Sequence, residues 1–220
     1  MGQRQATPRP GREITPVIIG IDFDNTIASY DEPMHRLAVE WGLISSALPQ
    51  NKKLIRDTVR ALPDGESKWR GLQTYSYGPG MRDARPMEGM KAFLADCRAR
   101  HIPVWIVSHK TEFANFGDPT VNLRAAALDW MEREGLLDSE SLGVGRERIF
   151  FEDTREEKIA RIKSLEITHF IDDLEETFLE NTFPREVNRI LLARHRPRDI
   201  SDQWTSFPTW QEIRRHLLAA

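Results

Sequence analysis

Two carboxylates directly after an apolar run constrain this chain more than any other feature of its sequence. The run Val17-Ile18-Ile19 is followed by Asp22 and Asp24. A β-branched run of this kind is typical of a buried strand. Residues two apart in an extended chain point to the same side, so the two carboxylates would lie together. Such a pair binds a cation or divides the roles of nucleophile and acid–base catalyst. The alternative is a strand end with two solvated acids.

Size and composition narrow the class of protein. The chain has 220 residues, 40% of them hydrophobic, which suits one large domain or a core with a small insert. Its formal net charge of −3 gives no support to general binding of nucleic acid or membrane surfaces. Cys97 is the single cysteine, which excludes an internal disulfide and a cysteine-based metal site. Residues 1–15 are polar and lack the apolar core of a secretory signal, so we expect a disordered lead-in and a cytoplasmic protein.

Short apolar runs alternate with helical patterns along most of the chain. This alternation is typical of an α/β fold with a doubly wound parallel sheet. Right-handed crossovers would then bring the carboxyl ends of all its strands to one edge. The predicted strands are Val17–Ile21, Val104–Val107, Ile149–Phe151, His169–Ile171 and Arg189–Leu192, and the predicted helices are Pro86–Arg100, Val121–Glu134 and Arg155–Leu165, with an N-capped helix near the C-terminus after Ser206.

One interval, residues 29–83, breaks the alternation. It has no strong strand signal and carries three helical patterns that end near Tyr77-Gly78-Pro79-Gly80. We therefore predict a small helical insert over residues 29–83, within an α/β core formed by residues 16–28 and 84–220. Arg70, Arg82 and Arg85 in and beside this interval are candidate contacts for a second anionic group of a ligand, although each alone is more simply a surface charge.

Further polar residues follow the other predicted strands. Ser108 ends the second strand, Asp172 and Asp173 end the fourth, and Lys158 lies in the helix before the fourth. Strands that end at one edge would bring these side chains to Asp22. Carboxylate oxygens suit Mg²⁺, which commonly also takes a substrate phosphate oxygen. A hydroxyl and an ammonium would hold the remaining phosphate oxygens. The sequence has neither a GxxxxGK[ST] loop nor a GxGxxG turn after a strand, so ATP or dinucleotide use has no support.

In this order, these residues resemble the four motifs of the haloacid dehalogenase (HAD) superfamily. The motifs are Asp22-Phe23-Asp24-Asn25-Thr26, then Ser108, then Lys158, then Asp172-Asp173. The resemblance covers roughly residues 17–27 and 86–215. It implies a Rossmann-like HAD core, in which the helical insert between the first two motifs is a small cap over the site.

The resemblance implies roles for the four acids. Asp22 would attack phosphorus and form an aspartyl-phosphate, and Asp24 would protonate the leaving oxygen and then activate water. Mg²⁺ would be held by the carboxylates of Asp22 and Asp173 and by the backbone carbonyl of Asp24. Asp172 would lie just outside the metal, although either member of the adjacent pair could be the direct ligand.

The resemblance also implies a binding site for the transferring phosphoryl group. Ser108 and Lys158 would bind it with their side chains, and His109 beside it would supply a backbone N–H rather than a base. Thr26 would help to fix the turn after the first strand at that site. A solvated helix face is the alternative for Lys158, with Lys110 as a weaker rival, and a helix cap is the alternative for Ser108.

An acid at position 24 favours a phosphatase within this superfamily, because members without it tend to be dehalogenases or stable phosphoenzymes. We therefore expect a Mg²⁺-dependent phosphatase that acts on a small-molecule phosphomonoester such as a sugar phosphate. The long polar loop from Ser108 to Pro119 would lie beside the leaving group. A 5′-nucleotidase and a phosphomutase are the alternatives among enzymes. A phosphate-binding regulatory protein with this fold is the alternative outside them, and the sequence carries no signal for an oligomeric state.

Overall fold

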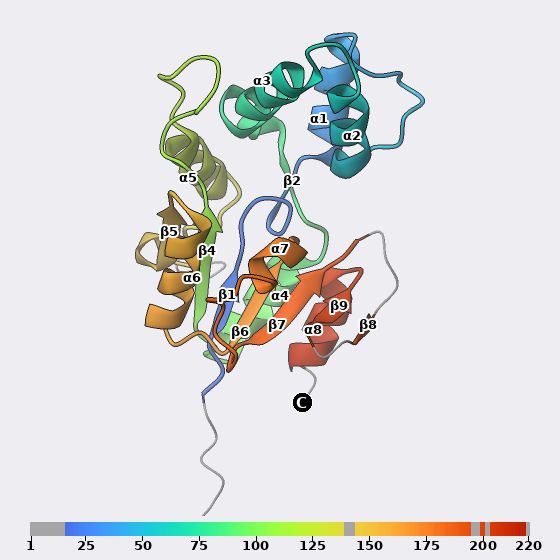
Figure 1. The fold of residues 1–220 in the computed structure, drawn as a ribbon. Coiled ribbons are helices and arrows are strands. Elements are labelled where there is room, and N and C mark those ends of the chain that lie inside the picture. The colour runs from blue at the N-terminus through green and yellow to red at the C-terminus, as the bar shows by residue number, and fades with distance from the viewer. Residues whose placement is uncertain (1–15, 139–143, 195–198, 201–202, 219–220) are drawn as a thin grey trace, which may run out of the picture.

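A parallel sheet forms the centre of the molecule in the computed structural model, which describes residues 16–138, 144–194, 199–200 and 203–218 (Figure 1). The predicted lead-in, residues 1–15, lies outside this range. The strand order is β5-β4-β1-β6-β7-β9-β8, and only β8 runs antiparallel to its neighbour. The predicted doubly wound α/β fold is therefore confirmed. The strands are β1 (Ile19–Ile21), β4 (Val104–His109), β5 (Ile149–Glu152), β6 (His169–Asp172), β7 (Asn188–Leu192), β8 (Asp199–Ile200) and β9 (Thr205–Phe207).

The central strand β1 is buried along its whole length and pairs with β4 on one side and β6 on the other. Strands covered on both faces are continuously apolar in sequence, which is why this run was recognisable. Gly20 lies where a Cβ atom would come within 2.6 Å of the Phe170 ring and 2.7 Å of Ile167, so the close packing of β1 requires glycine. The chain emerges from the middle of the sheet at Asp22, whose backbone N–H donates to the carbonyl of Ile171 at 2.9 Å.

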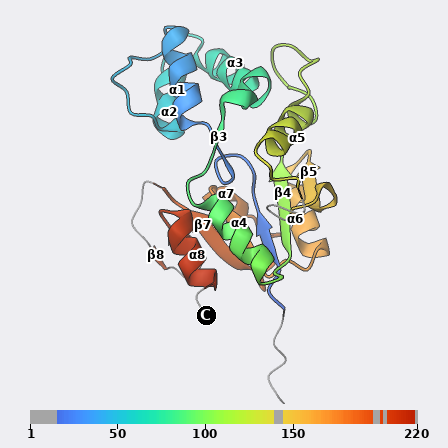
Figure 2. The same ribbon diagram turned by 180° about the vertical axis from the view of Figure 1, so that it is seen from behind.

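Helices cover both faces of the sheet. On one face α4 (Met90–Ala99), α5 (Leu123–Arg133) and α8 (Trp210–Leu218) pack on the larger apolar core, and Figure 2 shows α4 and α8 in front of the sheet. On the other face α6 (Arg155–Ser164) and α7 (Glu175–Phe178) pack on a smaller core. The helix predicted from Pro86 begins only at Met90, because Gly89 adopts a left-handed φ of 84° and Pro86 belongs to a short strand.

The interval between β1 and β4 is helical, as its apolar pattern indicated. It contains α1 (Asp31–Glu40), α2 (Lys52–Arg60), α3 (Gly65–Tyr77) and the 3-10 helix η1 (Pro79–Asp83). We call these four elements the helical insert. The chain enters it through β2 (Ala28–Ser29) and leaves it through β3 (Arg85–Pro86), and these two strands pair antiparallel. In Figures 1 and 2 the helical insert stands beyond the carboxyl edge of the sheet.

The C-terminal part contains two strands that were not predicted, β8 and β9. β9 pairs parallel with β7 and buries Ser206 and Phe207, although the sequence after Arg194 indicated only a terminal helix. That helix is present as α8, and the Thr209 hydroxyl accepts a hydrogen bond from the backbone N–H of Glu212 at 3.2 Å. Among the described helices none is both long and apolar enough to cross a membrane.

Candidate active site

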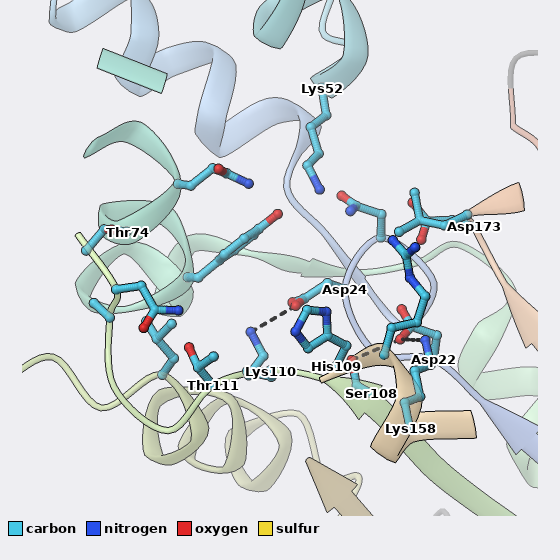
Figure 3. A pocket seen from close by; sticks show the side chains of 18 of the residues that line it. Asp22, Asp24, Lys52, Thr74, Ser108, His109, Lys110, Thr111, Lys158 and Asp173 are labelled. Atoms are coloured by element: carbon cyan, nitrogen blue, oxygen red, sulfur yellow. Dashed lines mark hydrogen bonds and ion pairs between the residues drawn. The ribbon is translucent and has the colours of Figure 1, made fainter. Parts of the chain in front are cut away.

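The carboxyl ends of β1, β4 and β6 meet beneath the helical insert and enclose a cavity of about 440 Å³ (Figure 3). The two walls of this cavity come from parts of the chain that are distant in sequence. The sheet edge and the loops after it form one wall, and α2 and α3 of the helical insert form the other. Of the predicted site residues, the sheet edge and the loops after it contribute Asp22, Asp24, Ser108, His109 and Asp173 to the lining, and α6 contributes Lys158.

Asp22 is the centre of the hydrogen bonds in this cavity. Its Oδ1 accepts from the Ser108 hydroxyl at 2.9 Å and from the Lys158 ammonium at 2.7 Å. Lys158 lies one turn into α6, whose start is fixed by a capping box between Thr154 and Glu157. The structure therefore brings together the first three predicted motifs, with Ser108 and Lys158 both buried against Asp22.

The acids form a compact cluster. Carboxylate oxygens of Asp22, Asp172 and Asp173 all lie within 4.8 Å of one another. Burial raises the pKa of Asp22 to about 6 and Asp172 adds to the rise, although Lys158 opposes it. Burial and then Asp172 raise the pKa of Asp173 well above its usual range. Carboxylates crowded in this way are stabilised in their charged forms by a cation, and a set of oxygen ligands fits Mg²⁺.

The two adjacent acids have different surroundings. Asp172 is fully buried, with Oδ2 accepting from the Lys158 ammonium at 2.7 Å and Oδ1 accepting from the backbone N–H of Leu174 at 2.9 Å. Asp173 is only half-buried and lines the cavity. Burial lowers the pKa of Lys158, but Asp172 and Asp22 raise it more, so Lys158 is an ammonium at neutral pH. Of the pair, Asp173 is thus the acid that faces the cavity.

Asp24 lies in the turn after β1, where Asn25 adopts a left-handed φ of 61° that asparagine tolerates. Its Oδ1 accepts a hydrogen bond from the Tyr30 hydroxyl at 2.6 Å, and its Oδ2 pairs with the Lys110 ammonium at 2.9 Å. Lys110 therefore does not compete with Lys158 for the Asp22 cluster. Tyr30 was not singled out in the sequence, because an aromatic residue at the start of a helical pattern reads as packing.

The wall from the helical insert was only partly foreseen. It consists of Lys52, Arg70, Gln73, Thr74 and Tyr77. In Figure 3 the Lys52 side chain points from α2 into the cavity. Burial lowers the pKa of Lys52, but Tyr77, Asp173 and Asp24 together raise it more, so Lys52 presents a positive charge.

Two of the three predicted arginine contacts lie away from this cavity. Among the described residues that line it, Arg70 is present, but Arg82 and Arg85 are not. The Arg85 guanidinium instead pairs with Glu32 at 2.7 Å. Both lie near the exit of the helical insert, where the simpler interpretation of each as a surface charge fits their positions.

His109 and Thr26 differ in their access to a ligand. His109 lines the cavity, and its Nε2 lies 3.0 Å from the backbone carbonyl oxygen of Asp153. Thr26 is fully buried and, within the described part of the chain, is not among the lining residues. Its backbone carbonyl accepts from the Trp210 indole at 2.9 Å, which ties the turn after β1 to α8. This arrangement fits a residue that fixes the turn and not one that touches a phosphate.

Comparison with known proteins identifies the fold. No family model and no curated protein matches the sequence. A dehalogenase structure with an intermediate complex has a TM-score of 0.56 at 11% identity, covering 93% of this chain and 98% of its own. A HAD family hydrolase from Deinococcus radiodurans R1, with bound phosphate and sodium, has a TM-score of 0.52 at 15% identity, covering 93% and 96%. A haloacid dehalogenase-like hydrolase from Xanthomonas campestris has a TM-score of 0.52 at 13% identity, covering 93% and 95%. The chain has the fold of HAD-superfamily hydrolases, as its motifs predicted.

Proposed function

We propose that this protein, whose fold is that of the HAD superfamily, is a Mg²⁺-dependent phosphatase that hydrolyses a small organic phosphomonoester. The observation that carries the proposal is the convergence of Ser108 and Lys158 on Asp22, beside Asp173 and with Asp24 two residues on. A hydroxyl and an ammonium at a buried carboxylate form a site for a phosphoryl group. The D. radiodurans hydrolase, which holds phosphate, supports a phosphate ligand for this fold.

The proposed reaction has two steps. Asp22 attacks phosphorus, so a bond from its carboxylate oxygen to phosphorus forms as the bond to the leaving oxygen breaks, and Asp24 gives that oxygen a proton. Water then attacks the aspartyl-phosphate and gives a proton to Asp24, which releases phosphate and restores Asp22. Ser108 and Lys158 bind the phosphoryl oxygens throughout. The carboxylates of Asp22 and Asp173 would hold Mg²⁺ with the backbone carbonyl of Asp24, and the bound metal would offset the charge repulsion between carboxylate and phosphate.

The cavity supports a small anionic substrate. Its volume of about 440 Å³ lies within the usual range of small-molecule sites. Five cationic side chains line it, which outnumber its three carboxylates and suit a ligand of negative charge: Lys52, Arg70, Lys110, Arg155 and Lys158. We include in the proposal that residues 29–83 form a cap domain over the core, since α2 and α3 supply one wall of the cavity.

Dehalogenation and hydrolysis of nucleoside monophosphates are the two alternatives to this proposal. Some structures of similar fold are dehalogenases, but a halide leaving group needs no proton, so an acid anchored at Asp24 favours an oxygen leaving group. A 5′-nucleotidase is the second candidate, because the aromatic rings of Tyr77 and Phe116 line the cavity and could stack on a base.

A substrate panel with three arms tests the function. Phosphate release is measured from sugar phosphates and nucleoside monophosphates, and halide release from 2-haloacids, each with Mg²⁺ and with EDTA. We expect phosphate release that requires Mg²⁺ and that the Asp22→Asn variant lacks. Halide release without phosphate release, or full phosphatase activity in EDTA, would contradict the proposal. The nucleotide arm decides between the two phosphatase candidates.

A further inference from the structure

Asp24 is anchored by two side chains that lie outside the four motifs. The Tyr30 hydroxyl donates to Oδ1 at 2.6 Å and the Lys110 ammonium pairs with Oδ2 at 2.9 Å, so each oxygen has one partner. An ionised carboxylate offers about four lone-pair sites on its two oxygens. Each oxygen of Asp24 therefore keeps a site at which it can exchange a proton with a substrate.

Both anchors are themselves held firmly. Tyr30 is fully buried, its hydroxyl lies 3.0 Å from Met81 Sδ, and its ring packs edge-on against Tyr77 with the centroids 4.8 Å apart. The buried Lys110 ammonium lies 4.8 Å from the centroid of the same Tyr77 ring. The backbone N–H of Lys110 donates to the backbone carbonyl of Glu152 at 2.9 Å. Anchors with so little freedom fix the direction of the carboxylate between them.

Asp24 borders the part of the cavity into which the leaving group of a substrate would point. In Figure 3 its side chain lies between the Asp22, Ser108 and Lys158 cluster and the part of the cavity bounded by Thr74 and Thr111. A leaving oxygen departs on the side of phosphorus opposite the attacking oxygen. A phosphoryl group on Asp22 would thus point its leaving oxygen away from the cluster, into the space that Asp24 borders.

We propose that Tyr30 and Lys110 are positioning residues that hold Asp24 in the orientation for proton transfer to and from the leaving group. The inference rests on the phosphatase function proposed above. Tyr30 directly precedes α1, and Met81 and Tyr77 belong to η1 and α3. The orientation of Asp24 therefore depends on the helical insert being seated as it is here.

The test compares substrates that differ in their need for a proton. Tyr30→Phe and Lys110→Met each remove one anchor and keep the bulk of the side chain. Tyr75→Phe and Lys53→Met are matched controls on exposed residues of the helical insert. With an alkyl phosphate, whose leaving group must be protonated, kcat/KM of each anchor variant should fall about 10- to 100-fold, since acid–base help is typically worth about 10²–10⁴. This ratio reports binding and phosphoryl transfer to Asp22, and not the later hydrolysis step that both substrates share. With p-nitrophenyl phosphate, which leaves readily, the loss should be several-fold smaller.

A double-mutant cycle separates positioning from structural support. In an Asp24→Asn background no proton can be transferred from residue 24, so Tyr30→Phe should lower kcat/KM no further. Thermal unfolding of each variant shows whether it is folded. A loss of equal size in kcat/KM on both substrates, or a Tyr30→Phe effect that persists at full size with Asp24→Asn, would overturn the positioning role. Wild-type protein without phosphatase activity would overturn the proposed function and this inference with it, whereas active wild-type protein with unaffected anchor variants would overturn this inference alone.

Discussion

At the residue scale, the proposed function gives Asp22 two roles, as nucleophile and as metal ligand, and Asp22→Asn separates both roles from folding. In Asp22→Asn the neutral amide is neither a nucleophile nor an anionic metal ligand, so turnover should be abolished. The fold should survive, because Lys158 keeps Asp172 as its partner at 2.7 Å. Phosphate release and the thermal midpoint, measured on the same preparation, check this. Near wild-type kcat in the folded variant would refute the nucleophile assignment.

The adjacent acids Asp172 and Asp173 should respond differently to the same substitution. Asp173→Asn removes a carboxylate that faces the cavity, so the Mg²⁺ concentration for half-maximal activity should rise by at least ~10-fold. Loss of a residue that only hydrogen-bonds to a metal ligand already costs about that much in metal affinity. Asp172→Asn weakens the buried pair with Lys158 and should chiefly lower the thermal midpoint. A Mg²⁺ titration and a melting curve of each variant make the comparison. The reverse pattern would assign the metal to Asp172.

Sequence reasoning found the residues at strand ends and Lys158 in the helix before the fourth strand, but it missed two residues that reach the site from the helical insert. Asp22, Ser108 and Asp173 could be placed because the carboxyl ends of parallel strands share an edge. Tyr30 and Lys52 could not, since their contact with the site depends on how the helical insert packs on the core, which no local pattern encodes.

At the scale of elements, the loop after β4 is bound to α3 of the helical insert. The Thr74 hydroxyl donates to the Phe116 carbonyl at 3.0 Å, and Arg70 donates to the Asn115 carbonyl at 3.3 Å. The Arg70 guanidinium also lies 4.8 Å from the centroid of the Phe116 ring. These contacts join the two walls of the cavity at a point remote from β2 and β3.

Loosening that contact should weaken substrate binding more than chemistry. Thr74→Val removes one hydrogen bond worth about 0.5–1.5 kcal/mol, so KM for the best substrate of the panel should rise roughly 2- to 10-fold with kcat little changed. Thr120→Val is the control, because the Thr120 hydroxyl bonds to Asp118 within the same loop. Steady-state kinetics of both variants decide the matter, and an equal change in the control would show that the loop and not its contact with α3 sets KM.

Strands without an apolar run were the ones that sequence patterns could not reveal. The five predicted strands each carry a β-branched or aromatic run, and all five are present. β2, β3 and β9 are as short as β1 or shorter and carry no such run, and β9 is held by its pairing with β7 and by the burial of Phe207. The helix boundary at Met90 was misjudged because a single left-handed glycine, Gly89, precedes it.

At the scale of the whole molecule, metal binding should be visible as stability. Three buried or half-buried acids within 4.8 Å repel one another in the folded chain and separate on unfolding. Mg²⁺ at 100 times its Kd would stabilise the folded state by about 2.7 kcal/mol. That corresponds to a rise of roughly 5–10 °C in the thermal midpoint for a chain of this size.

Calorimetry with Mg²⁺, with EDTA, and with monovalent salt at matched ionic strength tests the linkage. The rise should appear only with Mg²⁺ and should shrink in the Asp173→Asn variant. An unchanged midpoint at saturating Mg²⁺ would argue against a metal site in this cluster.

The pairing of β2 with β3 has a mechanical consequence. The helical insert is attached through two neighbouring strands, Ala28 opposite Pro86 and Ser29 opposite Arg85. A domain that is connected through two paired strands can rotate about the axis through both strands, but it is restrained against rotation about other axes. Tyr30 comes directly after one of these strands, so a rotation that admits solvent would also draw its hydroxyl from Asp24. Opening of the helical insert would therefore also take Asp24 out of alignment for acid–base catalysis. Bulk water that enters the open site would then lack an aligned base to activate it, so a phosphorylated Asp22 would be protected from premature hydrolysis.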